Sequence, residues 1–133
     1  MSCSGPMSNA RYTLPMIQLP RMCRGTKPYA EAVERTRALV TERIAYWSQI
    51  YGIPYGRIFV RKQKTRWGSC SVARNLNFNY RLGFLPFHLA DYIVVHELCH
   101  IPQQNHSDAF WALVAEAYPE YKTLRKELHS YRF

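Results

Sequence analysis

The sequence predicts an α+β fold with a long N-terminal helix, a small antiparallel sheet of about three strands, a second buried helix and further helices at the C-terminus. Three observations support this prediction. Apolar residues recur at helical spacing over residues 28–51, the period changes to two over residues 57–82, and an apolar helical run follows over residues 86–102. A chain of 133 residues with 47% hydrophobic residues has the size and composition of one domain with a real core.

Residues 1–27 are expected to form a flexible N-terminal tail before the folded domain at residues 28–133. Proline and glycine recur through this segment with small polar residues between them, which disfavours regular structure. Three apolar residues in its second half are candidates for packing against the domain: Met16, Ile17 and Leu19.

The first long helix is predicted from about Pro28 to Tyr51. Thr26 suits the N-cap, Pro28 suits an early helical position, and Gly52 and Pro54 end the helix. Its apolar positions lie on one stripe, which we expect to face the core: Val33, Val40, Ile44, Trp47 and Tyr51.

Strands are predicted over residues 57–61, 67–72 and 75–82, where apolar and polar side chains alternate. Residues 73–75 are the expected hairpin connection. The three strands should form an antiparallel sheet.

The last third of the chain is predicted to be helical. A buried helix runs from about Pro86 to Pro102, because proline discourages continuation of a helix. Asn105 is the expected cap of a helix over residues 106–118, and a proline separates that helix from a last one over residues 120–130.

The predicted buried helix contains the motif His96-Glu97-x-x-His100. Residues i and i+4 of an α-helix lie about 40° apart, so both histidines can point at one metal ion. Glu97 lies about 100° round the helix from His96, where its carboxylate can deprotonate a metal-bound water. A turn at Pro102 can bring His106 back as a third ligand. Three protein ligands with an open fourth position are typical of catalytic Zn²⁺.

Other interpretations of this motif and of its neighbouring residues are open. A core helix with two incidental histidines is possible, because three fixed residues do occur by chance; the sequel through His106 favours the metal site. Glu116 is an alternative third ligand, ten residues beyond His106. Cys99 lies about 60° round the helix from His96, on the side away from Glu97, and is predicted to be a small core residue.

The formal net charge of +9 favours anionic partners. Basic side chains interleave with aromatic ones along the predicted sheet, a pattern typical of a surface for single-stranded nucleic acid or an acidic polypeptide. We expect this surface to bind polyanions weakly and without sequence preference. A solvated sheet face is the equally weighted alternative. The residues concerned are Arg57, Arg61, Lys62, Lys64, Arg66, Arg74 and Arg81, with Phe59, Trp67, Phe78 and Tyr80.

We expect a cytoplasmic protein that has no membrane partner. The sequence has no apolar run of about 18 residues and no apolar signal-peptide core near its start. Its cysteines form no Cys-x-x-Cys pair and are expected to be reduced thiols: Cys3, Cys23, Cys70 and Cys99.

Three segments together resemble the YgjP-like metal-dependent hydrolase family, relatives of the WLM and SprT-like zincins. They read KTRWGSCS over residues 64–71, NYRL over residues 79–82, and YIVVHELCH followed by NHSDAFW within residues 92–111. The resemblance covers roughly residues 28–130. It implies a minimal zincin-like fold, peptidase chemistry on a polypeptide, catalysis by Glu97, and zinc on His96, His100 and His106.

This chain departs from the family pattern in two respects. Cys99 stands where the family usually has alanine, a small substitution that should fit. Full-length YgjP-like proteins also carry an N-terminal region of several strands, which residues 1–27 are too short to supply.

In zincins an extended substrate usually lies along an edge strand beside the metal-binding helix. Residues 75–81 are the candidate strand here, because their main chain can pair with a peptide. The tentative substrate-binding residues are therefore Asn77, Asn79, Tyr80 and Arg81. Candidate donors to the oxyanion are Tyr80, Tyr118 and Tyr121, and the sequence does not choose among them.

The predicted function is that of a zinc-dependent metallopeptidase in which Glu97 activates a zinc-bound water. Two other classes stay open. One is a nucleic-acid-associated zinc protein, either a protease of DNA-bound proteins, as SprT-like relatives suggest, or a non-catalytic binder. The other is a non-peptidase amide hydrolase. Glu97 favours catalysis, because a purely structural metal site needs no general base.

Overall fold

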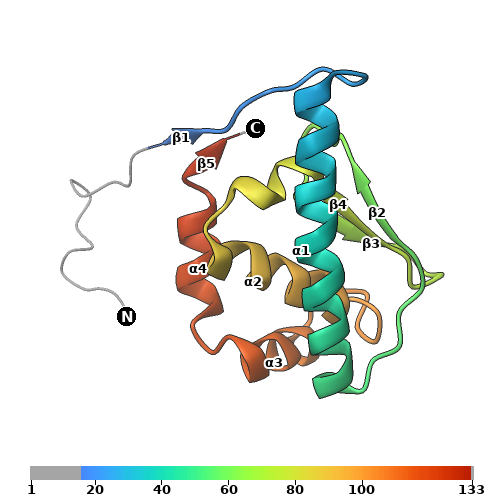
Figure 1. Cartoon of the computed structure of the whole chain (residues 1–133). Coiled ribbons are helices and arrows are strands. Elements are labelled where there is room, and N and C mark those ends of the chain that lie inside the picture. The colour runs from blue at the N-terminus through green and yellow to red at the C-terminus, as the bar shows by residue number, and fades with distance from the viewer. Residues whose placement is uncertain (1–15, 133) are drawn as a thin grey trace, which may run out of the picture.

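The computed structural model describes residues 16–132, and predictions for residues 1–15 lie outside this range. It confirms the α+β class, with helices gathered around one central helix and a small sheet at one side (Figure 1). In chain order the elements are β1 (Ile17–Gln18), α1 (Lys27–Tyr51), β2 (Ile58–Arg61), β3 (Gly68–Cys70), β4 (Leu76–Asn79), the 3₁₀ helix η2 (Tyr80–Phe84), α2 (Phe87–Cys99), α3 (Asp108–Ala117), α4 (Tyr121–Leu128) and β5 (Tyr131–Arg132).

Helix α1 begins and ends as predicted. The Thr26 hydroxyl accepts a hydrogen bond from the Tyr29 amide, which caps the N-terminus. Gly52 follows the last turn with a φ of 69°, a left-handed conformation that glycine adopts without a steric penalty. The buried stripe is turned slightly from the predicted one, since Val33 is only partly buried. Its buried residues are Ala32, Thr36, Val40 and Ile44.

The three-stranded sheet has the order β2-β4-β3 and is mixed. Strands β3 and β4 form the predicted antiparallel hairpin, with Gly68 opposite Phe78. Strands β2 and β4 run parallel, with Ile58 opposite Leu76, so the prediction of an all-antiparallel sheet is wrong for this pair. Side-chain alternation reports which face a residue occupies, not strand direction. Parallel strands need a long connection, and β3 with its hairpin provides it.

Strand β4 ends earlier than predicted because side chains capture the backbone beyond it. The Asn79 side chain accepts a hydrogen bond from the Arg81 amide at 3.0 Å. The Thr36 hydroxyl of α1 donates to the Tyr80 carbonyl and accepts from the Gly83 amide. These bonds bend residues 80–84 into η2 instead of continuing the strand.

Helix α2 is the centre of the fold and contacts α1, α3, α4 and β3 (Figure 1). Most of its residues are buried, as its sequence predicts. It ends at Cys99 with His100 as C-cap, close to the predicted end. The following helix begins later than expected: Ser107, not Asn105, caps α3 by accepting a hydrogen bond from the Phe110 amide.

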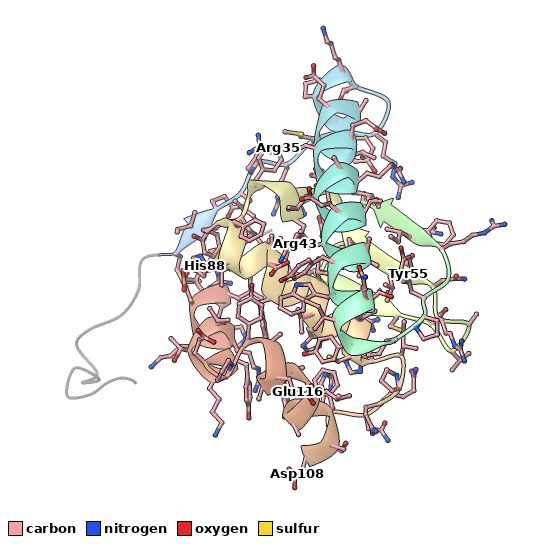
Figure 2. All side chains as sticks on the ribbon, turned by 60° about the horizontal axis from the view of Figure 1, so that its bottom comes forward. Arg35, Arg43, Tyr55, His88, Asp108 and Glu116 are labelled. Atoms are coloured by element: carbon pink, nitrogen blue, oxygen red, sulfur yellow. The ribbon has the colours of Figure 1, made fainter. Side chains whose placement is uncertain are left out.

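A buried carboxylate fixes α2 against its neighbours. Asp91 is 1% exposed and accepts hydrogen bonds from Arg43 Nε at 2.7 Å and from Trp47 Nε1 at 3.1 Å, both on α1. The Tyr118 hydroxyl donates to the same carboxylate at 2.5 Å. Figure 2 shows Arg43 between α1 and α2. Because every bond joins α2 to another segment, this network sets the position of the helix.

Part of the segment predicted to be a loose tail lies against the domain. Strand β1 pairs in parallel with β5, with the Ile17 amide donating to the Ser130 carbonyl and the Leu19 amide to the Arg132 carbonyl. Of the three apolar candidates in this segment, only Leu19 is buried.

Two further findings concern helices and cysteines within residues 16–132. No helix in this range combines the length and apolar character needed to cross a membrane. The cysteines of the range are free, and Cys99 is buried in the core as predicted.

Candidate active site

Three histidine side chains converge at the end of α2. His96 and His100 come from the helix, and His106 comes from the loop before α3. Their ligating atoms lie within 4.8 Å of one another. The Nε2 atom of His106 is 3.1 Å from Nε2 of His100 and 3.4 Å from Nε2 of His96. Two nitrogens bound tetrahedrally to zinc at about 2.0–2.1 Å lie about 3.4 Å apart, so the cluster fits a divalent metal ion.

The environment of His100 selects the tautomer that a metal ligand needs. Its Nδ1 atom lies 3.0 Å from the Gln103 carbonyl oxygen. A carbonyl can only accept, so Nδ1 carries the proton and the Nε2 lone pair faces the cluster. The first turn of α3 braces the rings: His100 stacks on Phe110 at 4.3 Å and His106 on Trp111 at 5.8 Å, measured between centroids.

Burial favours the neutral form of the two histidines on α2. Burial, followed by the neighbouring His100 and His106, lowers the pKa of His96 to about 3. Burial also lowers the pKa of His100. Neutral histidines keep the lone pairs with which a metal is bound.

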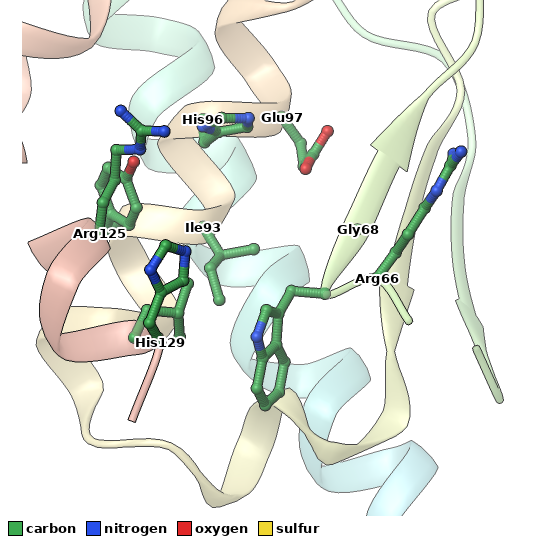
Figure 3. Close-up of a pocket in the computed structure, with 10 residues that line it drawn as sticks. Arg66, Gly68, Ile93, His96, Glu97, Arg125 and His129 are labelled. Carbon is green, nitrogen blue, oxygen red and sulfur yellow. The ribbon is translucent and has the colours of Figure 1, made fainter. Parts of the chain in front are cut away.

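Glu97 lies beside His96 and faces β3 at Gly68 (Figure 3). It is 7% exposed, and burial raises the pKa of its carboxyl to about 8, against the opposing charge of Arg66. The close approach of β3 requires glycine at residue 68. A Cβ on Gly68 would lie 3.0 Å from Glu97 Cγ and 2.9 Å from the Asn77 carbonyl oxygen. A carboxyl with a pKa near neutrality is suited to general acid–base catalysis.

Two adjoining cavities flank Glu97, with volumes of about 330 and 240 Å³. The larger reaches His100 and His106, and the smaller extends toward α4. Together they form a cleft along β3, which is an edge strand with one side unpaired in the three-stranded sheet. Both cavities are lined by Arg66, Gly68, His96 and Glu97.

The structure does not bear out β4 as the substrate-binding strand. Strand β4 is central, so its main chain is already paired on both sides. Asn79 and Tyr80 are fully buried and Arg81 is 4% exposed. The Asn79 amide donates to the carbonyls of residues 63 and 66, and the Asn77 side chain accepts from Arg61. These side chains support the sheet and η2, and β3 takes the edge position beside Glu97.

Two of the three candidate oxyanion donors are engaged elsewhere. Tyr80 is fully buried, with its hydroxyl beside the Met22 amide, and the Tyr118 hydroxyl donates to Asp91. Tyr121 stacks on Trp111 with centroids 4.8 Å apart and so packs beside the histidine cluster. Only Tyr121 keeps its candidacy.

The remaining candidate ligands lie outside the histidine cluster. Glu116 is exposed on α3 (Figure 2), and its carboxylate does not belong to the cluster of ligating atoms formed by the three histidines. Cys70 lines the larger cavity, but burial and then Glu97 raise the pKa of its thiol to about 11, so it stays protonated.

The predicted interleaving of basic and aromatic side chains does not form one surface. Phe78 and Tyr80 are fully buried, so neither can stack on a base. Arg81 is buried as well, and Arg61 lies over the Phe59 ring at 4.6 Å. The stacking platform expected for single-stranded nucleic acid is therefore lacking on β4.

Sequence reasoning gave no role to several residues that line the cleft. Tyr92 precedes His96 by four residues, and this spacing places it on the same face of α2. This spacing could have indicated from the sequence that Tyr92 lies near the site. Arg125 joins the smaller cavity from α4, and nothing in the local sequence indicates it.

Comparisons with known proteins agree with this geometry. The family model described as "YgjP-like, metallopeptidase domain" matches residues 29–131. The crystal structure of the metallopeptidase zymogen abylysin of Pyrococcus abyssi is similar, with a TM-score of 0.62 and 21% identity over 67% of this chain and 90% of that one. The zymogen jannalysin of Methanocaldococcus jannaschii has a TM-score of 0.58 and 20% identity, covering 68% and 91%.

No match to a curated protein was found. The two crystal structures show that this chain shares its fold with those metallopeptidase zymogens. The family match spans most of the described chain, and the chain therefore belongs to the YgjP-like metallopeptidase domain family and is a metal-dependent peptidase.

Proposed function

We propose that this chain is a zinc-dependent peptidase in which His96, His100 and His106 hold the metal and Glu97 is the general base. The observation that supports this most is the spacing of the three Nε2 atoms beside a buried carboxyl at an open cleft. The polypeptide substrate would lie extended in that cleft. Glu116 is exposed and outside the cluster, which favours His106 as third ligand.

Zinc, when bound, supplies a Lewis acid that polarises the scissile carbonyl and acidifies water. Glu97 accepts the proton of the attacking water and returns it to the leaving amine. Its raised pKa suits both transfers near neutral pH, since a base that must also act as an acid works best when its pKa is near the operating pH. The unpaired edge of β3 can hold the peptide main chain by strand addition.

The substitution Glu97→Gln tests this role most directly. It keeps the size of the side chain and removes its basicity. Glu97 is not a metal ligand in the proposal, so zinc content by metal analysis and the circular dichroism spectrum should not change. Chelator-sensitive hydrolysis of unfolded casein should fall by about 10²–10⁴-fold.

Two outcomes would count against this assignment. Wild-type activity in the Gln variant would mean that another group is the base. Loss of zinc from that variant would make Glu97 a ligand. Small amides serve as the comparison substrate, because cleavage of amides and not of casein would favour a non-peptidase amide hydrolase. The free cysteines suit a reducing compartment, and we place the protein in the cytoplasm.

A further inference from the structure

We propose that the smaller cavity beside Glu97 is a specificity subsite that binds a carboxylate of the peptide substrate through the Tyr92 hydroxyl and the Arg125 guanidinium. This proposal rests on the proposed peptidase function and names the substrate class for the same cleft. The carboxylate is either an acidic side chain or the C-terminal carboxylate, since both present the same two oxygens.

The first observation is a buried hydroxyl group with nothing to bind. Tyr92 is 2% exposed, and its hydroxyl has no hydrogen-bond partner among residues 16–132. Its ring packs edge-on against His96 with centroids 6.0 Å apart, and it lines the cavity. Leaving a buried hydroxyl unpaired destabilises a fold. A hydroxyl kept at such a cost, at the wall of a cleft, indicates a donor held ready for a ligand atom.

The second observation is a cation without a carboxylate partner. Arg125 of α4 lines the same cavity, and none of the ion pairs within residues 16–132 includes it. Its guanidinium lies over the Trp111 ring, 4.7 Å from the centroid, which fixes the side chain and leaves its donors available. Figure 3 shows Arg125 at one wall, reaching toward His96, with Glu97 on the side of β3.

The charge and size of the cavity agree with a carboxylate. Among the residues of the range 16–132 that line it, Glu97 is the one acidic side chain, whereas Arg66 and Arg125 are cations. Ile93 and Leu128 provide apolar walls for a methylene stem. The volume of about 240 Å³ is below the range of about 300–1,000 Å³ for whole small-molecule sites, and suits one side chain or chain end.

Peptide binding tests the proposal without requiring turnover. The zinc-loaded Glu97→Gln variant serves as the background, so that no peptide is cleaved. The probes are Ac-Ala-Ala-Glu-Ala-Ala-NH₂ against its Gln counterpart, and acetyl-pentaalanine as free acid against its amide, measured by calorimetry at low salt. In at least one pair the carboxylate peptide should bind about tenfold tighter or more, the scale of one charge-assisted hydrogen bond. The pair that shows the difference identifies the source.

Three further substitutions assign the effect to residues. Arg125→Gln should remove the preference, and Tyr92→Phe should reduce it severalfold. Lys126→Gln removes the same charge from the next residue of α4, which does not line the cavity, and should keep the preference. Tyr92→Phe should melt at the same temperature or higher, because it removes only an unpartnered buried hydroxyl.

Several outcomes would overturn the subsite. Equal binding within both pairs would do so, as would no measurable binding of either carboxylate peptide. A preference that survives Arg125→Gln but disappears on zinc removal would place the carboxylate on the metal. A lower melting temperature for Tyr92→Phe would mean that the hydroxyl is already satisfied. A wild-type protein that binds the acidic peptide with the predicted preference and never cleaves any peptide would defeat the proposed function and support the subsite.

Discussion

Gly68 determines how closely β3 approaches Glu97. The nearest atoms to a Cβ at this position are the Asn77 carbonyl oxygen and the Glu97 side chain. The carbonyl belongs to the neighbouring strand and cannot move without disturbing the sheet. Any side chain at residue 68 must therefore displace β3 or push the carboxyl away from the cleft.

Gly68→Ala is predicted to impair catalysis more than metal binding. Its methyl group should shift Glu97 or β3, and a displacement of about 1 Å can cost about 10² in rate. We expect kcat/KM to fall by about 10–100-fold and the free energy of unfolding by about 1–3 kcal/mol, with zinc content unchanged. Val72→Ala, at an exposed residue just beyond β3, is the matched control. Full activity in Gly68→Ala would show that catalysis does not depend on the close approach of β3 to Glu97.

At the residue scale, the sequence predicts those site residues that follow the geometry of one helix. His96, Glu97 and His100 lie where helical spacing puts them. The position of His106 depended on a turn that proline chemistry suggests, and it too joins the cluster. Asn79 and Arg81 were expected to bind substrate because their strand was expected at the edge of the sheet, whereas β4 is central and both side chains are buried.

At the element scale, α2 carries the histidine pair and Glu97, and α1 holds α2 in place through Asp91. The Arg43–Asp91 pair is mostly shielded from solvent, with 19% and 1% of the two side chains exposed. Trp47 and Tyr118 satisfy the same carboxylate. The stability contributions of this carboxylate and its donors depend on one another, because removing the carboxylate leaves all of the donors unpaired.

Asp91→Asn is predicted to destabilise the protein by about 2–4 kcal/mol. This is below the 3–5 kcal/mol typical of a fully buried pair, because Arg43 keeps some contact with water. Tyr118→Phe removes one bond to a charged group and should cost about 1.5–3 kcal/mol. Urea unfolding monitored by circular dichroism measures both values. Glu34→Gln, which breaks an exposed ion pair with Arg37, is the control and should change little. If Asp91→Asn left the free energy of unfolding unchanged, α2 would be positioned by apolar packing alone.

Element positions were easier to predict than element pairing. The bounds of α1 and the hairpin between β3 and β4 agree with capping and turn residues. The parallel pairing of β2 with β4 does not follow from the sequence, because strand order depends on contacts between distant residues. The same limit explains why β4 was expected at the edge of the sheet and β3 was not.

At the scale of the whole molecule, the proposed zinc would bind the folded chain and so stabilise it. A ligand at about 100 times its dissociation constant adds about 2.7 kcal/mol when it binds only the folded state. Adding zinc to metal-free protein should therefore raise the melting temperature. His106→Ala should lose most of this increase and stay folded without metal, because His106 is exposed and outside the core.

Two controls separate this effect from general metal binding. Glu97→Gln should keep the increase, and so should Glu116→Ala. An increase that disappears in Glu116→Ala and persists in His106→Ala would move the third ligand to α3. Metal analysis of the purified variants checks the same assignment without heating.

The histidine cluster also has a consequence for folding. All three histidines lie within residues 96–106, so loop closure between them costs little chain entropy. The other parts of the cleft come from residues 66–70 and 125–129, which reach α2 only through long-range contacts. Those contacts form later, because closing long loops is slow. We therefore expect the histidines of a refolding chain to come together before β3 and α4 complete the cleft, so that catalytic competence is the last property of the site to form.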